Sequence, residues 1–149
     1  GSQTLVIFDI TKAFLNGELA LAQGEPDHAL VVIDTLHVWL DTMGVTYYQP
    51  EAHWLRSKIL RVLGREEDAI SALEAGIAAA RSTGARHPAW LMLVELAEMQ
   101  DGRGGEQEVQ EARREASDLF DAILRHTTEP DLRASLLSRP EALFVRRRL

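Results

Sequence analysis

The chain has 149 residues, of which 46% are hydrophobic and 26% charged, a composition typical of one soluble domain with a sizeable core. Its 16 basic and 23 acidic residues give a net charge of −7, which argues against nucleic acid as the main partner, because phosphate binding needs clustered Lys and Arg. The absence of cysteine excludes disulfides and thiolate metal sites, and no apolar run approaches the roughly 18 residues of a membrane span. We therefore expect a cytoplasmic protein that does not enter a membrane.

We expect a single domain over residues 3–149. Gly1 and Ser2 resemble the remnant of a cleaved expression tag, and without an initiator Met the chain reads as a fragment of a longer protein. Within the domain we expect three helix pairs and a C-terminal helical segment, at about residues 4–44, 48–84, 87–127 and 128–149.

The first pair is predicted from the helical spacing of apolar residues between Thr4 and Gln23. The stretch LVIFDI alone could form a short strand, but the length of the segment and the GEPD turn after it favour a helix. A second helix is expected from Pro26 to Thr42, because proline suits the first helical turn and Gly44 suits the residue after the end.

The second pair repeats the first when the sequence is shifted so that Leu15 falls on Leu55. The shift aligns helix-ending glycines, apolar positions and aromatic residues. Aligned residues include Leu15 with Leu55, Gly17 with Ser57, Leu19 with Ile59, Phe14 with Trp54, Gly24 with Gly64 and Gly44 with Gly84. The small residues Ser57 and Ala69 fall where the two helices of the second pair can cross closely. Such units cannot bury their apolar faces alone, so the repeat predicts a stack of helix pairs.

The third pair and the C-terminal segment follow the pattern less closely. Helices are expected at about 88–99 and 106–126, separated by a flexible QDGRGG segment, and this pair departs from the register of the first two. Thr128 is expected to be the N-cap of a further short helix, which Pro140 interrupts. A divergent last repeat is expected because a terminal unit must show a polar outer face.

The helix pair at residues 53–84, with small residues at its crossing and a glycine turn, resembles tetratricopeptide repeats, although its period exceeds their roughly 34 residues. EAHWLRSKILRVLGREEDAISALEAGIAAARSTGAR and the terminal EPDLRASLLSRPEALF resemble the long repeats near the C-terminus of large bacterial AAA-type ATPase regulators, including those with a nucleotide cyclase domain or a LuxR-type helix-turn-helix. The resemblance covers most of residues 11–145. It implies a sensor or scaffold arm of a signalling ATPase and identifies no catalytic residue.

Repeat and resemblance together predict an all-α fold, a right-handed α-solenoid of antiparallel helix pairs with about three pairs plus a terminal helix. The expected role is non-catalytic recognition of a protein, a peptide or another domain of the parent chain, within a bacterial signalling or transcription regulator. Two alternatives are a domain that senses a small-molecule effector and a self-association module that forms a homodimer.

No motif predicts catalysis, a metal or a cofactor. The five histidines lack close ligand spacing, and the acidic pairs stand at helix starts, where carboxylates interact favourably with the helix dipole. The serines lack a nucleophile elbow, and GRGG lacks the lysine and the preceding strand of a phosphate loop. We therefore expect no catalytic residue, no metal site and no cofactor.

The sharpest candidate site is the groove lined by the first helix of each pair, whose non-core positions meet ligands in such solenoids. The candidate residues are Phe14, Glu18 and Leu21 in the first pair, and Trp54, Lys58 and Arg61 in the second. An aromatic side chain beside two basic ones could hold an acidic peptide or a C-terminal carboxylate. The alternative interpretation is that Phe14 and Trp54 pack between the pairs, as aromatics at helical spacing usually do, and that Lys58 and Arg61 form a solvated face.

Two further groups of side chains are interpreted as structural. Trp39 and Trp90 are expected to pack in the core or between helices. The arginines at 133, 139 and 146–148 make the end of the chain locally basic, which we interpret as a solvated end and not as a nucleic-acid site, given the overall acidic charge.

Overall fold

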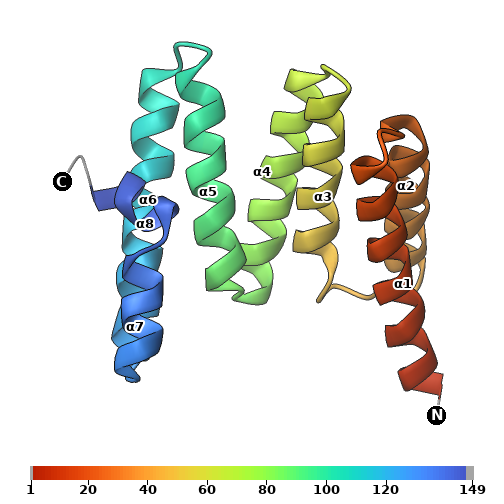
Figure 1. Cartoon of the computed structure of the whole chain (residues 1–149), viewed down its shortest axis with the longest axis horizontal. Coiled ribbons are helices and arrows are strands. Elements are labelled where there is room, and N and C mark those ends of the chain that lie inside the picture. The colour runs from red at the N-terminus through yellow and green to blue at the C-terminus, as the bar shows by residue number, and fades with distance from the viewer. Residues whose placement is uncertain (1, 147–149) are drawn as a thin grey trace. The chain divides into compact units, whose positions relative to one another are not determined.

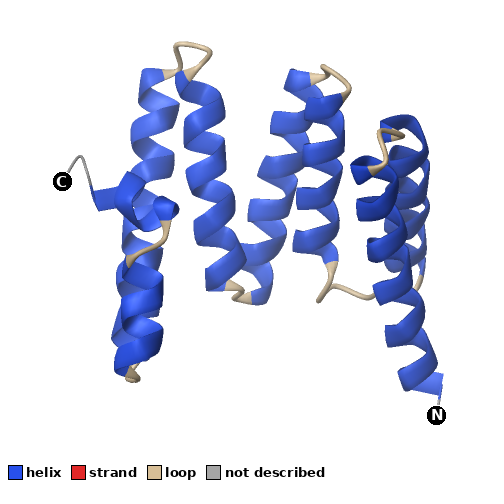
Figure 2. Cartoon of the chain, in the orientation of Figure 1, coloured by secondary structure: helices blue, strands red, loops and turns tan. Residues whose placement is uncertain are grey.

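The computed structural model describes residues 2–146, with side chains from residue 7 onward, and contains only helices and connections in that range (Figures 1 and 2). The eight helices of this range pack mostly as sequential, antiparallel-like pairs, which confirms the predicted all-α class and its helical repeat arrangement. None of the helices within residues 2–146 is long and apolar enough to cross a membrane. Their bounds are α1 Ser2–Ala22, α2 Pro26–Thr42, α3 Gln49–Val62, α4 Glu66–Thr83, α5 Arg86–Asp101, α6 Glu106–His126, α7 Pro130–Leu137 and α8 Pro140–Arg146.

The helix bounds follow the sequence signals closely. Both α2 and α6 begin and end at the predicted residues. The stretch LVIFDI lies inside α1, so the alternative of a short strand is wrong. Helix α5 begins at Arg86 and therefore precedes the predicted start at residue 88.

The chain divides into two compact units, residues 1–79 and 80–149. The first unit contains α1, α2, α3 and most of α4, and the second contains the end of α4 and all later helices. The expectation of a single domain over residues 3–149 stays a prediction.

Helix-ending turns of one backbone design recur at a constant interval along the chain. Gly24, Gly44, Gly64, Gly84 and Gly104 have φ angles of 76°, 67°, 75°, 72° and 77°, a left-handed conformation that costs glycine no Cβ clash. In each turn the next residue donates its N–H to the carbonyl five residues back; the Gly104 turn has this bond at 3.0 Å. Gly24, Gly64 and Gly104 are equally spaced in the sequence. The third pair therefore keeps the register of the first two, and the prediction that it departs from that register is wrong.

The register of the third pair was hidden because polar residues occupy buried positions. Arg113 and Ser117 are buried on α6, at the positions that Leu73 and Ile77 hold on α4. The Arg113 guanidinium lies 4.5 Å above the ring of Phe144 in α8, so a helix much later in the chain helps to cover it. A sequence reading that seeks apolar side chains at buried positions misses this equivalence.

The second helix pair crosses closely at two small residues, as predicted. The Ser57 hydroxyl on α3 donates a 2.7 Å hydrogen bond to the carbonyl oxygen of Ala69 on α4, and both residues are fully buried. At the equivalent position of α1, a Cβ added to Gly17 would lie 3.3 Å from the Leu55 side chain. The crossing of α3 and α4 therefore depends on small residues, and Gly17 allows the close approach of Leu55 from α3.

The core of the first unit joins the first helix pair to α3. It is built from the inward faces of the three helices and excludes solvent almost completely. Its buried members are Ile10, Ala20, Ala29, Ile33, Leu36, Leu40, Ala52, Leu55 and Ile59. Full burial of one Leu or Ile side chain stabilises the fold by about 1.5–3 kcal/mol, so this shared cluster holds the successive helix pairs together. Trp39 is half-buried against it, as predicted.

The core of the second unit centres on two aromatic rings. Trp90 on α5 is fully buried, as predicted, and its ring centroid lies 4.7 Å from that of Phe120 on α6. Ala142 and Val145 of α8 are buried as well, and α8 packs against α5 and α6. The terminal helix therefore covers the last pair.

The C-terminal segment is anchored by arginines. Arg133 donates to the carbonyl oxygens of Leu124 and Thr127 and so satisfies the end of α6. Glu129, and not Thr128, is the N-cap residue of α7, and no side chain makes a capping bond there; the Thr128 prediction is wrong because the connection is one residue longer. Two of the arginines expected at a basic end, 147 and 148, lie outside the described residues.

Candidate functional site

Five side chains from α1, α3 and the connection between α2 and α3 line a hollow of about 330 Å³. Two of the predicted groove residues, Phe14 and Glu18, belong to it. The others are Tyr47 and Tyr48, which precede α3, and Glu51 in its first turn. The structure therefore brings together Phe14 and Glu18 of the predicted groove, without Trp54, and adds two tyrosines and a second carboxylate.

The aromatic rings of this hollow form a chain from the core to the surface. The Phe14 ring centroid lies 6.5 Å from that of Tyr48, and Tyr48 meets Tyr47 edge-on at 5.0 Å. Phe14 and Tyr48 are half-buried against the core, whereas Tyr47 is 75% exposed. An edge-to-face arrangement is favourable for two aromatic rings, so the half-buried Tyr48 supports the exposed ring of Tyr47.

The basic members of the predicted groove lie further along α3. The Lys58 ammonium lies 4.5 Å from the centroid of the Trp54 ring, a cation–π contact. Lys58 and Arg61 line a second hollow with Val62, which is exposed. The remaining groove residue, Leu21, is half-buried against the core of the first unit and lines neither hollow.

Sequence reasoning missed Tyr47, Tyr48 and Glu51. It treated residues 45–50 as a simple connection, although both tyrosines of the chain stand next to each other there. Two adjacent tyrosines before a helix were the available signal, because Tyr is enriched at protein interfaces.

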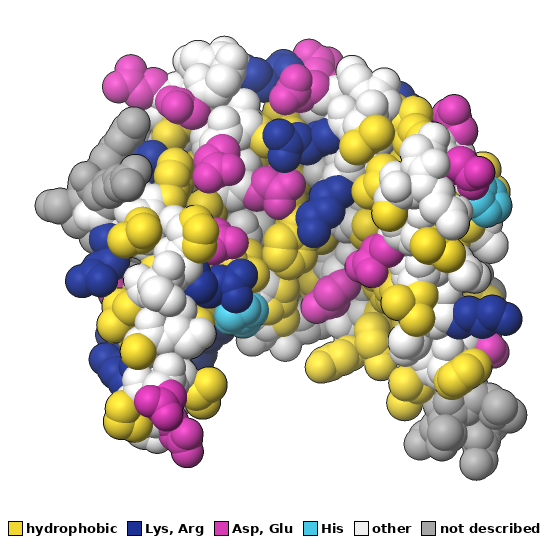
Figure 3. Space-filling model, viewed as in Figure 1, with side chains coloured by type: hydrophobic (Ala, Val, Ile, Leu, Met, Phe, Trp, Pro, Cys, Tyr) yellow, Lys and Arg dark blue, Asp and Glu magenta, His cyan; other side chains and the backbone are white. Residues whose placement is uncertain are grey.

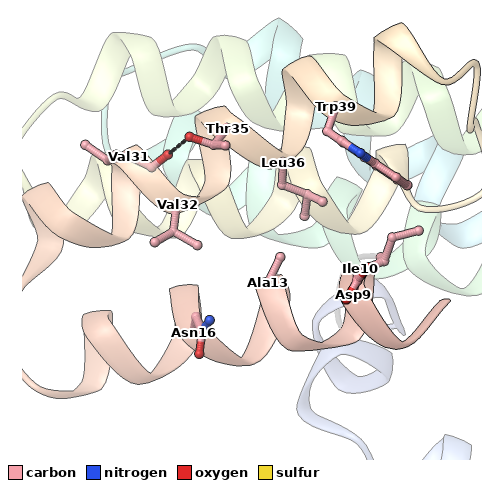
Figure 4. A pocket seen from close by; sticks show the side chains of 9 residues that line it. All are labelled: Asp9, Ile10, Ala13, Asn16, Val31, Val32, Thr35, Leu36 and Trp39. Atoms are coloured by element: carbon pink, nitrogen blue, oxygen red, sulfur yellow. Dashed lines mark hydrogen bonds between the residues drawn. The ribbon is translucent and has the colours of Figure 1, made fainter. Parts of the chain in front are cut away.

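A separate apolar groove of about 360 Å³ lies between α1 and α2 (Figure 4). The close-up shows side chains of both helices facing each other across it, with Asp9 and Asn16 as its polar members on α1. The hydroxyl of Thr35 donates to the Val31 carbonyl oxygen of its own helix at 2.8 Å. The groove is lined by Asp9, Ile10, Ala13 and Asn16 of α1 and by Val31, Val32, Thr35, Leu36 and Trp39 of α2.

Helices α1 and α2 also carry exposed apolar side chains. On α1 they are Ile7, Phe8, Leu15 and Leu19, and on α2 they are Val31 and Val38. In the space-filling view, hydrophobic side chains gather over α1 among scattered charges (Figure 3). Phe8, Leu15 and Leu19 are spaced i, i+7 and i+11 and so share one face of α1, and exposed apolar side chains that gather on one face often mark an interaction site.

A polar cluster lies between α2 and α3. The ring centroids of His37 and His53 are 4.3 Å apart. Gln49 donates from Nε2 to Asp41 Oδ1 at 2.9 Å, so its Oε1 accepts from His37 Nδ1 at 3.3 Å. This tautomer leaves His37 Nε2 as a buried acceptor with no partner among the described residues.

The His53 ring is neutral at physiological pH. Burial is the largest cause that lowers its pKa from 6.5 to about 4; the neighbouring His37 and Arg56 lower it further, and Asp41 opposes them. Within the described residues, no group of three or more His, Cys, Asp or Glu side chains is arranged to hold a metal ion. The cluster therefore combines two imidazoles and a buried ring nitrogen without a metal-ligand set.

Comparison of the chain with protein families, with curated proteins and with solved structures found no match. The assignment of a function therefore depends on the geometry of these surfaces.

Proposed function

We propose that this chain is a non-catalytic interaction scaffold that binds a protein segment, or another domain of its parent chain, across α1 and α3. The observation that carries the proposal is the hollow of Phe14, Glu18, Tyr47, Tyr48 and Glu51. An exposed tyrosine that packs edge-on against a half-buried one offers large contact area at a low entropic cost. Two carboxylates beside it favour a segment that carries a basic residue next to an apolar one.

The charge of this surface changes sign along α3. Glu51, Trp54, Lys58 and Arg61 follow one another at intervals of three, four and three residues, so they share one face of the helix. Glu51 and Arg61 are about 15 Å apart along the helix axis, given a rise of about 1.5 Å per residue. A partner segment in this orientation places a cation near Glu51 and an acidic group near Arg61. We therefore broaden the acidic peptide expected from the sequence to a segment that carries both a basic and an acidic group.

The resemblance to tetratricopeptide-like repeats supports the same role. It also leads to a finer proposal, in which the chain is the C-terminal arm of a bacterial signalling or transcription regulator. Binding of the partner would then favour one state of the attached ATPase or effector domain, through different affinities for its two states.

The experiment is a pull-down from a bacterial lysate with the wild-type chain and two charge-reversed variants. One variant carries Glu18→Lys with Glu51→Lys, and the other carries Lys58→Glu with Arg61→Glu. We expect the wild type to capture a protein that each variant captures at least about tenfold less, because like charges then face each other across the interface. Circular dichroism establishes that each variant has the helix content of the wild type.

A matched control carries two reversals on other exposed helix faces, Glu74→Lys on α4 and Asp118→Lys on α6. It has the same charge as the first variant and keeps the proposed surface intact. We expect it to capture the partner as the wild type does. Equal capture by all variants would place the binding surface elsewhere and overturn the proposal.

A further inference from the structure

In the second helix pair, a hollow of about 420 Å³ is covered on one side by helix α2. Its floor is made by His53 and Arg56 of α3 and by Ser71, Ala72 and Ala75 of α4. Its outer wall is made by four residues of one face of α2, spaced i, i+3, i+4 and i+7: Asp34, His37, Val38 and Asp41. The spacing is the one with which an amphipathic helix anchors in a groove.

The groove between α1 and α2 is the equivalent, in the first repeat, of this hollow in the second repeat. The shift that sets Leu15 on Leu55 moves five of its nine lining residues onto the floor of the second hollow. The pairs are Ala13 with His53, Asn16 with Arg56, Val31 with Ser71, Val32 with Ala72 and Thr35 with Ala75. In the second repeat a third helix, α2, also lines the groove, whereas the groove of the first repeat is lined by α1 and α2 alone.

The α1 face beside this groove shows the same contrast. Leu15 and Leu19 are 60% and 55% exposed, and their equivalents on α3, Leu55 and Ile59, are 6% and 0% exposed. The α3 residues are buried because the first helix pair packs against them. A neighbouring helix pair therefore covers these positions in the second repeat. In the first repeat, no neighbouring pair among the described residues covers the equivalent positions.

The charges of the first groove differ from those of the second in a way that specifies the ligand. In the second, Arg56 donates to Asp34 at 2.7 Å, and Gln49 donates to Asp41 at 2.9 Å. In the first, the position of Arg56 is held by the neutral Asn16 and that of Gln49 by the acidic Asp9. The imidazole of His53 is replaced by the small Ala13, which leaves room for a larger apolar side chain.

We infer that the α1–α2 groove binds an amphipathic α-helix of a partner protein, in the pose in which α2 lies against α3 and α4. The bound helix carries a neutral polar residue at the position of Asp34, a large apolar residue at that of His37 and a basic residue at that of Asp41. The basic residue pairs with Asp9. This inference rests on the proposed scaffold function because both assign protein recognition to the chain. The α1–α2 groove shares no residue with the hollow of Phe14, Glu18, Tyr47, Tyr48 and Glu51.

The test uses the whole chain and a fluorescein-labelled helical peptide that has the length of α2, 17 residues. The peptide keeps Ile33, Val38 and Leu40 of that helix, carries Asp34→Asn, His37→Leu and Asp41→Lys, and has Ala, Glu or Gln elsewhere. A hydrocarbon staple on its outer face preforms the helix, which is marginal at this length in water. A second peptide is identical except that the residue at position 41 stays Asp.

Fluorescence anisotropy should show saturable binding of the Lys peptide to the wild-type chain, and at least about tenfold weaker binding of the Asp peptide. An Asp9→Lys chain should reverse this preference, which a loss of folding cannot mimic. A Lys58→Glu, Arg61→Glu chain should bind the Lys peptide as the wild type does, so failure of the proposed function and failure of this inference are distinguishable.

Three outcomes would overturn the inference. The first is no binding of either peptide up to about 1 mM. The second is binding that does not respond to Asp9→Lys. The third is light scattering that shows a dimer which Leu15→Glu dissociates, because a second copy of the chain would then occupy this face.

Discussion

Ser57 and Ala69 join α3 to α4: the Ser57 hydroxyl donates to the Ala69 carbonyl oxygen at 2.7 Å in an interior that excludes solvent. The two residues are 12 positions apart and frame the Gly64 turn. One buried hydrogen bond and one close helix crossing are therefore supplied by the same pair of small residues. The equivalent position on α1 is Gly17, where an added Cβ would lie 3.3 Å from the Leu55 side chain of α3.

Replacing Ser57 tests this crossing. Ser57→Ala keeps the volume and removes the hydrogen bond, so we expect a loss of about 1 kcal/mol in the free energy of unfolding. Ser57→Leu forces the helices apart and should cost about 1–3 kcal/mol or more. Urea unfolding followed by circular dichroism measures both, with Ser71→Ala on the exposed face of α4 as a control. A smaller loss for Ser57→Leu than for Ser57→Ala would contradict close packing at this point.

The recurring glycine turns lead to an expectation about the segment QDGRGG. Gly104 has φ +77° and Gly102 has φ −63°. Of these two glycines in one turn, only Gly104 therefore has the left-handed backbone conformation that favours glycine. Gly104→Ala places a Cβ in the left-handed region and should lower the free energy of unfolding by about 1–2 kcal/mol. Gly102→Ala meets only ordinary contacts and should be neutral or stabilise by up to about 1 kcal/mol. Chemical denaturation of the pair of variants measures the contrast, and equal effects would mean that the turn is not held as described.

Protonation of His53 should make stability depend on pH. Its pKa is about 4 in the folded chain because burial and the neighbouring His37 and Arg56 lower it, whereas an unfolded chain takes up the proton near pH 6.5. The unfolded state therefore binds more protons between these values. The stability that neutral His53 contributes is complete above about pH 6.5 and is lost as the pH falls toward 4.

The measurement for His53 is the midpoint of urea unfolding at about pH 7, 6 and 5 for the wild type and for His53→Gln. We expect the wild type to lose more stability than the variant over this range. His28→Gln, at an exposed imidazole on α2, serves as the control and should follow the wild type. Parallel profiles for the wild type and His53→Gln would show that the ring is not held neutral in the fold.

The sequence predicted helices and turns well because their signals are local. Pro26 at a helix start and Gly44 after its end fixed the bounds of α2, and left-handed glycines mark successive helix ends. The third pair was predicted, but its register was not, because Arg113 is buried there through contact with Phe144, and a contact between residues so far apart leaves no local pattern.

The candidate surfaces were predicted only in part for the same physical reason. Phe14, Trp54 and Lys58 followed from helical spacing on one face of each first helix. The orientation of Tyr47 depends on the turn before α3, and the approach of His37 to His53 depends on how α2 packs against α3. Both are set by tertiary packing and not by the residues next to them in the chain.

The scaffold proposal is tested most directly by photo-crosslinking in bacterial cells with a benzophenone amino acid in place of Tyr47. We expect a covalent adduct with a partner protein or with another part of the parent chain. The adduct should be absent when the benzophenone replaces Glu74 on α4, and it should decrease strongly when Glu18→Lys and Glu51→Lys accompany the Tyr47 replacement. Adducts of equal yield at Tyr47 and Glu74, unaffected by the charge reversals, would contradict recognition at this surface.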